Sequence, residues 1–565
     1  MKSKLLSIRV ILLLLATIVL VVASLRNQMV LNFCFTRVSY YLLWLMFSFW
    51  FIFLFRQIEN RRDLIRSFLK LYGTGILFAL GISILIFVTV PPYLRVLSDE
   101  ATLLSASQSM TFDRQCNLIL QGVNYGFSFR PLELAIPRRP LAFPFFIHIL
   151  HALSGYRVEN AFVLNFLAFF SLLSMVFVFV KKTLGNLWGF VSLVLIACQP
   201  IIVETATSAG FDLFALLLIF ICFIALKMFL EAPSAHRFYF LWIHLLWLAH
   251  TRYESPVFIL IVLVCLLLGH YLKKEFFNSS LLYPATPLLL LPILWQRLLA
   301  AAPYLELEND VAFSVSHLIR HSFSFFQYAF SFQQILPSAL IINVMGLMGL
   351  VFFILLFFSK TQHTTKSNQH LFWISLASLL YLWIITNVYY YGDVTWYHCA
   401  RYFTIYFFIL SLLAAYFLKH SGWFEKQKGA LAVLMILFFS IYHPMSYQQG
   451  FTNRLNLSRH YRHEMAFIKQ QNKDKIFVIS KNPIHYTIHN IGAANFETAR
   501  KFTDRILADS RNKLYENIYA IQDIEITSGK PTPETDLSTG FALENVYEIQ
   551  NSDNALLRIS RVKLP

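Results

Sequence analysis

Charged residues are scarce in this chain. Only 14% of its 565 residues are Asp, Glu, Lys or Arg, whereas 57% are hydrophobic. Soluble domains carry about 25% charged and about 45–50% apolar residues. Such an excess of apolar side chains cannot be buried in one soluble core. The composition therefore excludes an ordinary soluble protein and predicts an integral membrane protein.

Metal-binding patterns are lacking too. The six cysteines form no Cys-x-x-Cys pair, and no spacing typical of metal ligands occurs. Most of the cysteines lie inside apolar runs, where the thiol behaves as a small buried hydrophobe. Cys116 and Cys399 are both expected on the outer side of the membrane, which leaves a disulfide between them open. No internal repeat is recognisable.

Acidic residues are outnumbered by basic ones, and the formal net charge is +17. This excess does not predict nucleic-acid binding. The basic residues lie mostly between apolar runs, where the positive-inside rule places them on the cytoplasmic side of a membrane.

Apolar runs long enough to cross a bilayer recur along the chain, since a spanning helix needs about 20 such residues. We predict thirteen spans, near 7–25, 39–55, 71–91, 160–180, 186–204, 210–230, 238–250, 256–271, 281–302, 338–358, 371–390, 401–418 and 430–443. Basic clusters follow the second, fourth, eighth and twelfth spans, all on one side. We therefore expect a cytoplasmic N-terminus and an outward C-terminus. The location that we expect is the inner (plasma) membrane of a bacterium, in keeping with the family resemblance described below.

The fold class expected is thus a polytopic α-helical membrane protein with a small outward-facing C-terminal α/β domain. Residues 1–70 form a transmembrane hairpin with a basic cytoplasmic loop, 71–443 the main transmembrane region, and 444–565 the outward domain. In the tail, strand-like runs occur at 476–480, 518–526, 541–550 and 555–562, and helical spacing at 496–514.

Two other outward segments are long. The first, 92–159, contains an apolar stretch at 141–153 that is too short to span, so we expect a helix in the membrane interface. The second, 303–337, contains Glu306, Glu308 and Asp310 and is interpreted as a mobile lid over a site.

Two adjacent carboxylates, Asp99 and Glu100, follow the third predicted span. A carboxylate at the outer surface could take a proton from an acceptor hydroxyl or amine. A second carboxylate could orient the first or hold a cation. The alternative is structural, with Ser98 or Asp99 as the N-cap of a helix over 101–110. Both readings are compatible.

Arginines in the outward segments are candidates for binding a phosphate ester. Arg138 and Arg139 precede the interfacial helix, and Arg401 opens the twelfth predicted span. Guanidinium groups suit phosphates because they stay charged and donate paired hydrogen bonds. Binding of lipid head groups is the alternative.

Further polar residues stand where spans begin or end. Asp212 opens the sixth span, Arg252 and Glu254 lie at the turn after the seventh, and His398 and Tyr402 flank Arg401. Charges near membrane depth are costly and are functional candidates by default. The alternative for the charged residues is that they pair and only neutralise one another. The alternative for His398 is a structural role, and for Tyr402 it is a place in the aromatic belt at the membrane surface.

In their order, these motifs resemble the GT-C superfamily of membrane glycosyltransferases, including the lipid A aminoarabinose transferase and the protein O-mannosyltransferases. The resemblance rests on short segments over roughly 71–443, namely Asp99-Glu100-Ala101, Arg139-Pro140-Leu141, Ser154 to Asn160, Phe211-Asp212, Thr251-Arg252-Tyr253-Glu254 and Arg401-Tyr402. It departs from the family at Arg138-Arg139-Pro140, where lysine-proline-proline is frequent, and in the N-terminal addition of 7–55.

The resemblance implies inverting transfer of a sugar from a polyprenyl-phosphate donor to a glycan, lipid or protein acceptor at the outer face of the membrane. It implies Asp99 as general base with Glu100 beside it, and Arg138, Arg139 and Arg401 near the donor phosphate. No cofactor is certain. A divalent cation stays open, with Glu100 or Asp99 as its ligand.

Other functions remain open at this point. A transporter or flippase of lipid-linked saccharides would also use arginines and aromatic residues near the membrane, although such proteins often have repeated halves. A glycan polymerase or ligase with a pyrophosphate-linked donor is a second alternative. A non-catalytic membrane scaffold whose tail binds a partner is the third.

Overall fold

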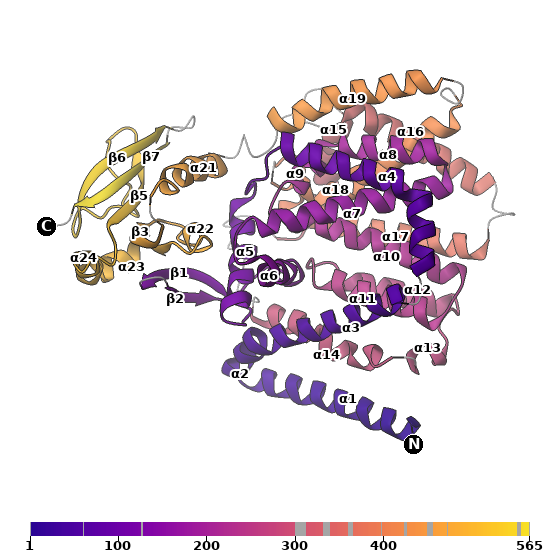
Figure 1. Cartoon of the computed structure of the whole chain (residues 1–565), viewed down its shortest axis with the longest axis horizontal. Helices are drawn as coiled ribbons and strands as arrows, with labels where there is room; N and C mark the ends of the chain where they lie inside the picture. The colour runs from indigo at the N-terminus through magenta and orange to yellow at the C-terminus, as the bar shows by residue number, and fades with distance from the viewer. Residues whose placement is uncertain are drawn as a thin grey trace. The chain divides into compact units, whose positions relative to one another are not determined.

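The computed structural model describes residues 2–59, 62–125, 128–278, 280–299, 312–330, 339–359, 365–396, 398–422, 427–448, 456–471, 473–550 and 555–563. The chain divides into two compact units (Figure 1). The helical unit is made of Met1–Tyr93, Pro140–Phe143 and Phe162–Phe451. The sheet unit is made of Leu94–Arg139, Pro144–Ala161 and Thr452–Pro565.

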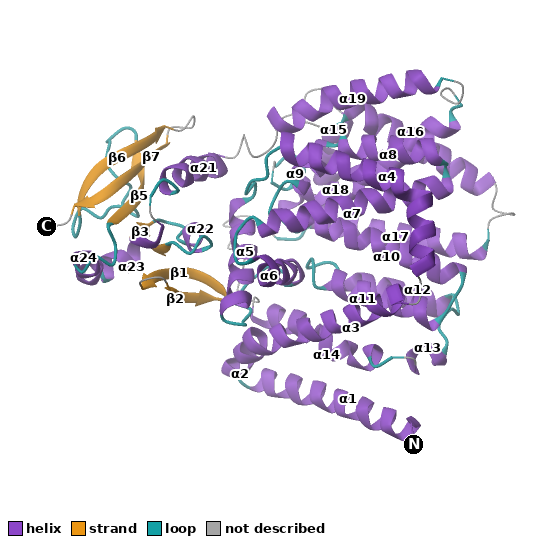
Figure 2. Ribbon diagram, in the orientation of Figure 1, coloured by secondary structure: helices purple, strands orange, loops and turns teal. Residues whose placement is uncertain are grey.

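The helical unit is built from helices and their connections (Figure 2). Its helices are α1 (Lys2–Arg26), α2 (Gln28–Phe33), α3 (Ser39–Glu59), α4 (Arg62–Thr89), α7 (Asn160–Thr183, which begins in the sheet unit), α8 (Asn186–Ala197), α9 (Pro200–Ala206), α10 (Asp212–Glu231), α11 (Ala235–Ala249), α12 (Pro256–Leu268), α13 (Lys274–Asn278), α14 (Leu282–Leu299), α15 (Val315–Phe330), α16 (Leu340–Ser359), α17 (Lys366–Val388), α18 (Thr404–His420) and α19 (Lys428–Gln448). A π-helical turn, Cys34–Val38, joins α2 to α3, and 3₁₀ turns occur at Tyr390–Gly392 and Ala400–Phe403.

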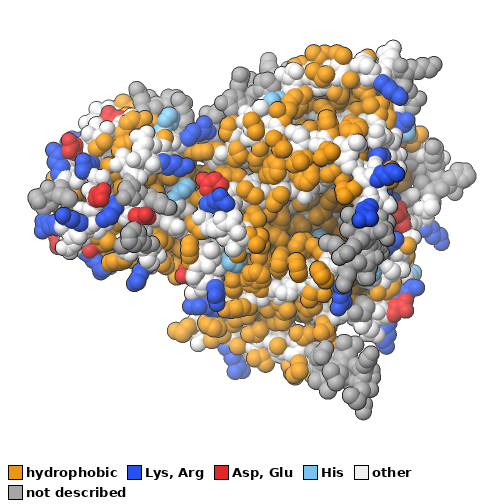
Figure 3. Space-filling model, in the orientation of Figure 1, with side chains coloured by type: hydrophobic (Ala, Val, Ile, Leu, Met, Phe, Trp, Pro, Cys, Tyr) orange, Lys and Arg blue, Asp and Glu red, His pale blue; other side chains and the backbone are white. Residues whose placement is uncertain are grey.

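A helix occupies each of the thirteen predicted spans. Within the described residues, seven helices are long and apolar enough to cross a membrane, and eight if a bent pair counts as one span. Hydrophobic side chains cover much of the face of this unit that Figure 3 shows. The chain is therefore an integral membrane protein, because a lipid environment hides such a surface from water.

The fifth predicted span is not a straight helix. Where the sequence predicts one span over 186–204, α8 and α9 meet at an angle of 77°. The break follows from Pro200 at the start of α9, because proline cannot donate the hydrogen bond that would continue α8. The short helix α9 then leads into the turn before α10.

Helices α16 and α18 pack closely because of two glycines. A Cβ at Gly346 would meet the backbone of Leu410, and one at Gly349 would meet the backbone carbonyl of Leu413. Small residues let two helix backbones approach in this way inside a membrane.

The N-terminal helices belong to the helical unit. Helices α1 and α3 pack against α14. Two tryptophans add polar contacts, since the indole N–H of Trp295 donates to Ser24 Oγ over 3.1 Å and that of Trp50 to His244 Nε2 over 3.2 Å. The added N-terminal segment is thus tied to the rest of this unit by specific side chains.

The sheet unit combines helices with one mixed sheet. Its elements are α5 (Leu97–Phe112), β1 (Leu118–Tyr125), β2 (Ser128–Ala135), α6 (Ala142–Ser154, whose first residues lie in the helical unit), α21 (Asn456–Ile468), a 3₁₀ turn (Lys473–Lys475), β3 (Ile476–Ile479), α22 (Ile484–Thr487), β4 (Gly492–Ala494), α23 (Phe496–Lys501), α24 (Thr503–Arg511), β5 (Asn517–Glu525), β6 (Ala542–Gln550) and β7 (Ala555–Lys563). The sheet has seven strands in the order β2-β1-β4-β3-β5-β7-β6. Strands β4 and β5 are parallel to β3, and the other neighbours are antiparallel.

The predicted strands and helix of the tail are confirmed, as is a helix at 141–153. Strands β1 and β2 were not predicted. They come from the first outward segment and join the tail's sheet where Gly122 of β1 lies opposite Ala493 of β4. A core that includes Phe477, Phe496 and Tyr515 packs one face of the sheet against α23 and α24.

Candidate functional site

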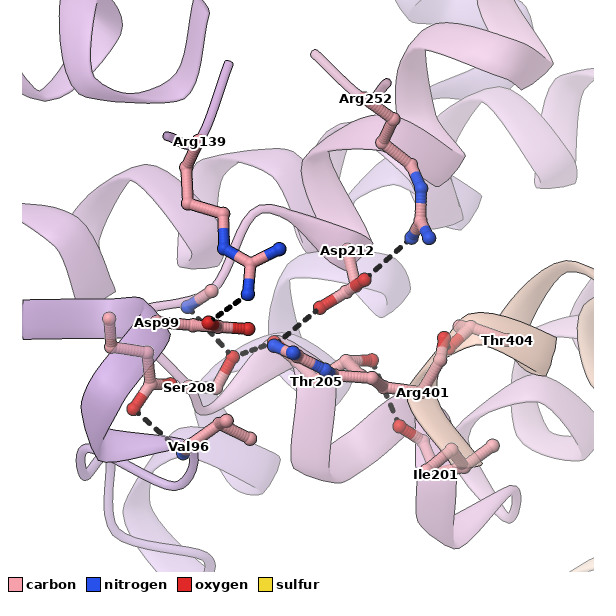
Figure 4. Close-up of polar contacts among 12 residues, drawn as sticks. Val96, Asp99, Arg139, Ile201, Thr205, Ser208, Asp212, Arg252, Arg401 and Thr404 are labelled. Carbon is pink, nitrogen blue, oxygen red and sulfur yellow. Dashed lines mark hydrogen bonds and ion pairs between the residues drawn. The ribbon is translucent and has the colours of Figure 1, made fainter. Parts of the chain in front are cut away.

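The carboxylate of Asp99 lies in the first turn of α5 and is almost buried, with 10% of its side chain exposed. A guanidinium nitrogen of Arg139 forms an ion pair with its Oδ1 atom (Figure 4). Arg139 comes from the segment between β2 and α6 and is 32% exposed. The pair joins two predicted site residues within the sheet unit and fixes the carboxylate in one orientation.

Glu100 has a different role in the same turn. It is buried, and its Oε2 atom accepts a hydrogen bond of 3.0 Å from the backbone N–H of Val96, the residue before the helix. The first N–H groups of a helix lack partners within the helix, so this carboxylate satisfies one of them. The expected N-cap at Ser98 or Asp99 is wrong: α5 begins at Leu97, and Val96 is the N-cap residue, with no side-chain cap.

Buried polar side chains further along α5 hold this helix in the sheet unit. Ser105 Oγ accepts from the backbone N–H of Ile119 in β1 over 2.7 Å. The amide nitrogen of Gln108 donates to Thr487 O and Asn490 Oδ1, both over 2.8 Å. The sequence shows Gln108 only as one polar residue among several, so its partners nearly 400 residues away could not be predicted.

A histidine of α6 also contacts α5. His151 is buried; its Nε2 lies 3.2 Å from Ser107 Oγ, and its Nδ1 lies 2.8 Å from the amide nitrogen of Asn160. An amide nitrogen can only donate, so Nδ1 is the acceptor and Nε2 carries the proton of the neutral ring. The helix that bears Asp99 is thereby hydrogen-bonded to β1, α6 and the α22 region.

In the helical unit, Asp212 is the centre of a buried charge cluster (Figure 4). It stands at the start of α10, where the helix dipole favours an acidic side chain. Its Oδ1 accepts from Arg252 Nη1 over 2.7 Å, and its Oδ2 accepts from Arg401 Nη1 over 3.4 Å. Both Asp212 and Arg401 have side chains that are only 3% exposed.

Arg252 is shared between two carboxylates. Its Nε forms an ion pair with Glu254, and its guanidinium lies over the rings of Phe211 (5.6 Å to the centroid) and Tyr402 (5.3 Å). The cluster therefore contains two guanidinium and two carboxylate groups. Buried charges are tolerated only when they are paired in this way.

The turn before Asp212 is held by a residue that sequence reasoning missed. Asn165 lies within α7, is fully buried, and donates from its amide nitrogen to Ser208 O over 2.7 Å and Gly210 O over 2.8 Å. Backbone carbonyls outside regular structure need such partners at membrane depth. An amide inside an otherwise apolar run was the available signal.

The remaining predicted residues lie in other environments. Arg138 is exposed. The ring of His398 lies beside Trp396, with 6.2 Å between centroids. The acidic residues Glu306, Glu308 and Asp310 of the expected lid lie outside the described residues. In short, Asp99 meets Arg139 in the sheet unit, while Asp212, Arg252, Glu254, Arg401 and Tyr402 meet in the helical unit.

The expected options for disulfide and metal can also be compared with the structure. None of the six cysteines, all of which the structure describes, is in a disulfide, so the bond left open between Cys116 and Cys399 is not formed. Across the described ranges, no group of three or more His, Cys, Asp and Glu side chains is arranged to hold a metal ion.

Comparisons with known proteins give likenesses of structure only. No family model matches the sequence, and no curated protein matches it. The structure of ArnT from Cupriavidus metallidurans bound to undecaprenyl phosphate is similar with a TM-score of 0.48 at 10% identity, over 86% of this chain and 97% of that one. Its apo structure gives 0.44 at 11% identity, over 86% and 98%.

An oligosaccharyltransferase from Archaeoglobus fulgidus, tethered to an acceptor peptide, has a TM-score of 0.44 at 11% identity, over 81% of this chain and 70% of that one. At such identities the likeness concerns the fold and assigns no role to any residue.

Proposed function

We propose that this protein transfers a sugar, with inversion, from a polyprenyl-phosphate donor to an acceptor at the outer face of the membrane. The observation that carries the proposal is the nearly buried Asp99 carboxylate, held at the start of α5 by Arg139. A buried carboxylate fixed at a helix start beside a cation is suited to accept a proton from a bound hydroxyl or amine.

Arginines supply the second requirement, a site for the departing phosphate. Arg139 carries a guanidinium, which stays charged and can donate paired hydrogen bonds to a phosphate. Arg138 is exposed and adds a second cation in the same segment. Arg401 contacts Asp212 through Nη1 and is the third cation that we assign to the phosphate. Positive groups held in place before the reaction stabilise charge that develops in the transition state.

The reaction is a single displacement. The acceptor's oxygen or nitrogen gives its proton to Asp99 and attacks the anomeric carbon of the donor sugar. The bond between that carbon and the phosphate oxygen breaks, and its electron pair leaves with the polyprenyl phosphate. One new glycosidic bond forms with inverted configuration. A phosphate is a good leaving group at neutral pH, so no second carboxylate has to protonate it.

The membrane arrangement is part of the proposal. We infer thirteen spans, a cytoplasmic N-terminus and an outward sheet unit in a bacterial inner membrane. Residues 1–70 are then an addition to the transferase region of 71–443, and the tail from 444 is an acceptor-facing domain. Asp212, Arg252 and Glu254 hold Arg401 and Tyr402 in position. If a divalent cation takes part, Glu100 or Asp99 is its ligand.

The test is sugar transfer from a panel of radiolabelled polyprenyl-phosphate sugars in membranes that contain the protein. We expect Asp99→Asn to lower transfer at least about a hundredfold, because it removes the proton acceptor while keeping the side chain's shape. The matched control is Asp504→Asn, which neutralises an exposed carboxylate on α24 and should transfer sugar like the wild type. Full transfer by a folded Asp99→Asn protein would refute the assignment of the base.

One observation favours a second candidate. The broken helix pair α8 and α9, bent by 77°, resembles the interrupted helices of transporters. A flippase would move a fluorescent lipid-linked saccharide across a proteoliposome membrane without changing it chemically. Movement of an intact saccharide, with no new glycosidic bond in the products, would favour the flippase over the transferase.

A further inference from the structure

A cavity that no proposed catalytic residue lines lies within the sheet unit. It has a volume of about 260 Å³ and is formed by the loop after α6, the end of α21 and the segment after α22. Pockets for small ligands start at about 300 Å³. The cavity therefore has room for one sugar ring and not for an extended chain.

The inner wall of the cavity is apolar, and the polar groups around it are mostly hydrogen-bond donors. Val158, Ile468 and Ile488 are buried and form part of the wall. Arg157 and Lys469 are exposed cations at the cavity, and Glu159 is the only carboxylate in its lining. The cations thus exceed the carboxylates, which favours an anionic ligand.

Two amide side chains in the lining add further N–H donors. Asn490 accepts at Oδ1 from Gln108, and Gln471 accepts at Oε1 from the hydroxyl of Tyr519 over 3.1 Å. Within the described part of the chain, neither amide nitrogen has a hydrogen-bond partner. A lining with two cations and two amide N–H groups suits a ligand rich in acceptors, such as a sugar that carries a carboxylate or a phosphate.

One wall of the cavity is hydrogen-bonded to α5, the helix that carries Asp99. Gln108 of α5 donates to Thr487 O and Asn490 Oδ1, and the hydroxyl of Tyr156 donates to Ile488 O over 2.7 Å. Asn490 has a positive φ of 59°, and its carbonyl accepts from the amide of Asn124 over 3.1 Å. A ligand that contacts Asn490 therefore touches a residue that also holds α5 in place.

We propose that this cavity binds an anionic sugar residue of the acceptor. The inference rests on the proposed transferase function, which it deepens by naming the acceptor's chemistry. The cations Arg157 and Lys469 bind the carboxylate or phosphate, the amides of Gln471 and Asn490 bind hydroxyl groups, and the apolar wall contacts the ring. The cavity is then an acceptor subsite apart from the carboxylate that takes the proton.

The first experiment measures binding to the full chain in lipid nanodiscs by saturation-transfer NMR. The probes are glucose 1-phosphate, glucuronate and neutral glucose. We expect the two anions to bind and glucose to bind at least about tenfold more weakly, since charge-assisted hydrogen bonds are about twice as strong as neutral ones. Arg157→Gln with Lys469→Gln should weaken anion binding by a similar factor. Lys481→Gln, at an exposed lysine away from the cavity, is the matched control.

Equal binding of the anions by the wild type and the double variant would overturn the inference, as would a preference for neutral glucose. Both replaced side chains are exposed, and an unchanged melting temperature would show that the double variant is folded. Asp99→Asn should bind the probes like the wild type. Binding therefore tests the cavity even if the assignment of Asp99 fails, and transfer that depends on Asp99 tests the function even if no probe binds.

A competition experiment separates an acceptor subsite from a site for free sugar phosphates. With a transferable acceptor in membranes, glucose 1-phosphate should raise the apparent KM for the acceptor and leave kcat unchanged. The double variant should show a raised acceptor KM with no further effect of the probe. Inhibition that lowers kcat at saturating acceptor would overturn the acceptor assignment and indicate a regulatory site for a free sugar phosphate.

Discussion

At the scale of single residues, adjacent side chains of the same type have different surroundings. Asp99 and Glu100 follow one another in α5, yet Asp99 pairs with the guanidinium of Arg139 while Glu100 accepts the backbone N–H of Val96. The sequence identified both as candidates for chemistry. It could not distinguish them, because their partners depend on where α5 begins and on a segment 40 residues away.

A third carboxylate, Glu464 of α21, allows a prediction on pH. The pKa of Glu464 is raised to about 7, chiefly by burial; the hydrogen bond from Tyr486 lowers the pKa, and the nearby Asp523 raises it. The folded state therefore binds more protons than the unfolded state between the ordinary pKa of 4.5 and about 7. The contribution of Glu464 to the free energy of unfolding is largest below this pH window. As the pH rises through the window, up to roughly 3 kcal/mol of this contribution is lost.

The variant Glu464→Gln should remove this dependence, because glutamine keeps an acceptor for Tyr486 and does not titrate. The measurement is the unfolding temperature of wild type and variant at about pH 5 and about pH 8. Between these two pH values, the unfolding temperature of the wild type should fall relative to that of the variant. Burial lowers the pKa of His485 to about 4, which acts in the opposite direction. That effect is common to both proteins and cancels in their difference. Parallel pH profiles would contradict the prediction.

At the scale of elements, local patterns were predicted and distant pairings were not. Strand-like runs in the tail predicted β3, β5, β6 and β7, and the length of apolar runs predicted the positions of the membrane helices. Strand β1 was missed because it has no regular alternation and pairs with β4, more than 350 residues further along the chain. The bend between α8 and α9 was missed although Pro200 marked it.

The same lesson applies to the candidate site. Asp212, Arg252 and Arg401 were each predicted from a charge at the end of an apolar run, and the structure joins them. Asn165 and Gln108 were not predicted, since nothing in a single amide residue shows whether it faces lipid, a neighbouring backbone or another segment. A charged side chain is so costly in a membrane that its presence at an apolar run marks a candidate residue. An amide side chain is less costly and gives no such signal.

Helix packing gives a prediction at this scale. Gly349→Ala should destabilise the protein, because the new methyl group would collide with the carbonyl of Leu413 in α18. Overpacking of this kind costs about 1–3 kcal/mol.

Gly81→Ala in α4 is the matched control, since a Cβ there meets nothing within 4 Å. Alanine at that position should be neutral or stabilising by up to about 1 kcal/mol, as alanine favours helices more than glycine does. Unfolding temperatures in detergent would rank the two variants, and an equal effect of both would contradict the packing argument.

At the scale of the whole molecule, the sheet constrains the membrane topology. Strands β1 and β2 precede most of the membrane helices, whereas β3 to β7 follow all of them, yet the seven form one sheet. Both segments must therefore lie on the same side of the membrane, so the chain between them crosses it an even number of times. Ten of the thirteen predicted spans lie between these segments, which satisfies this condition.

The even number of crossings determines which segments lie on the same side of the membrane, and the basic loops predict which side that is. In a variant with all six cysteines replaced, single cysteines at Lys273 and Lys481 would test it, because both side chains are well exposed, at 63% and 59%. We expect a membrane-impermeant maleimide to label Lys481→Cys in intact cells, because the proposed topology places the sheet unit outside. Lys273→Cys follows the eighth predicted span among basic residues and should be labelled only after the cells are permeabilised. The reverse pattern would invert the topology and place Asp99 in the cytoplasm, where transfer to an external acceptor could not occur.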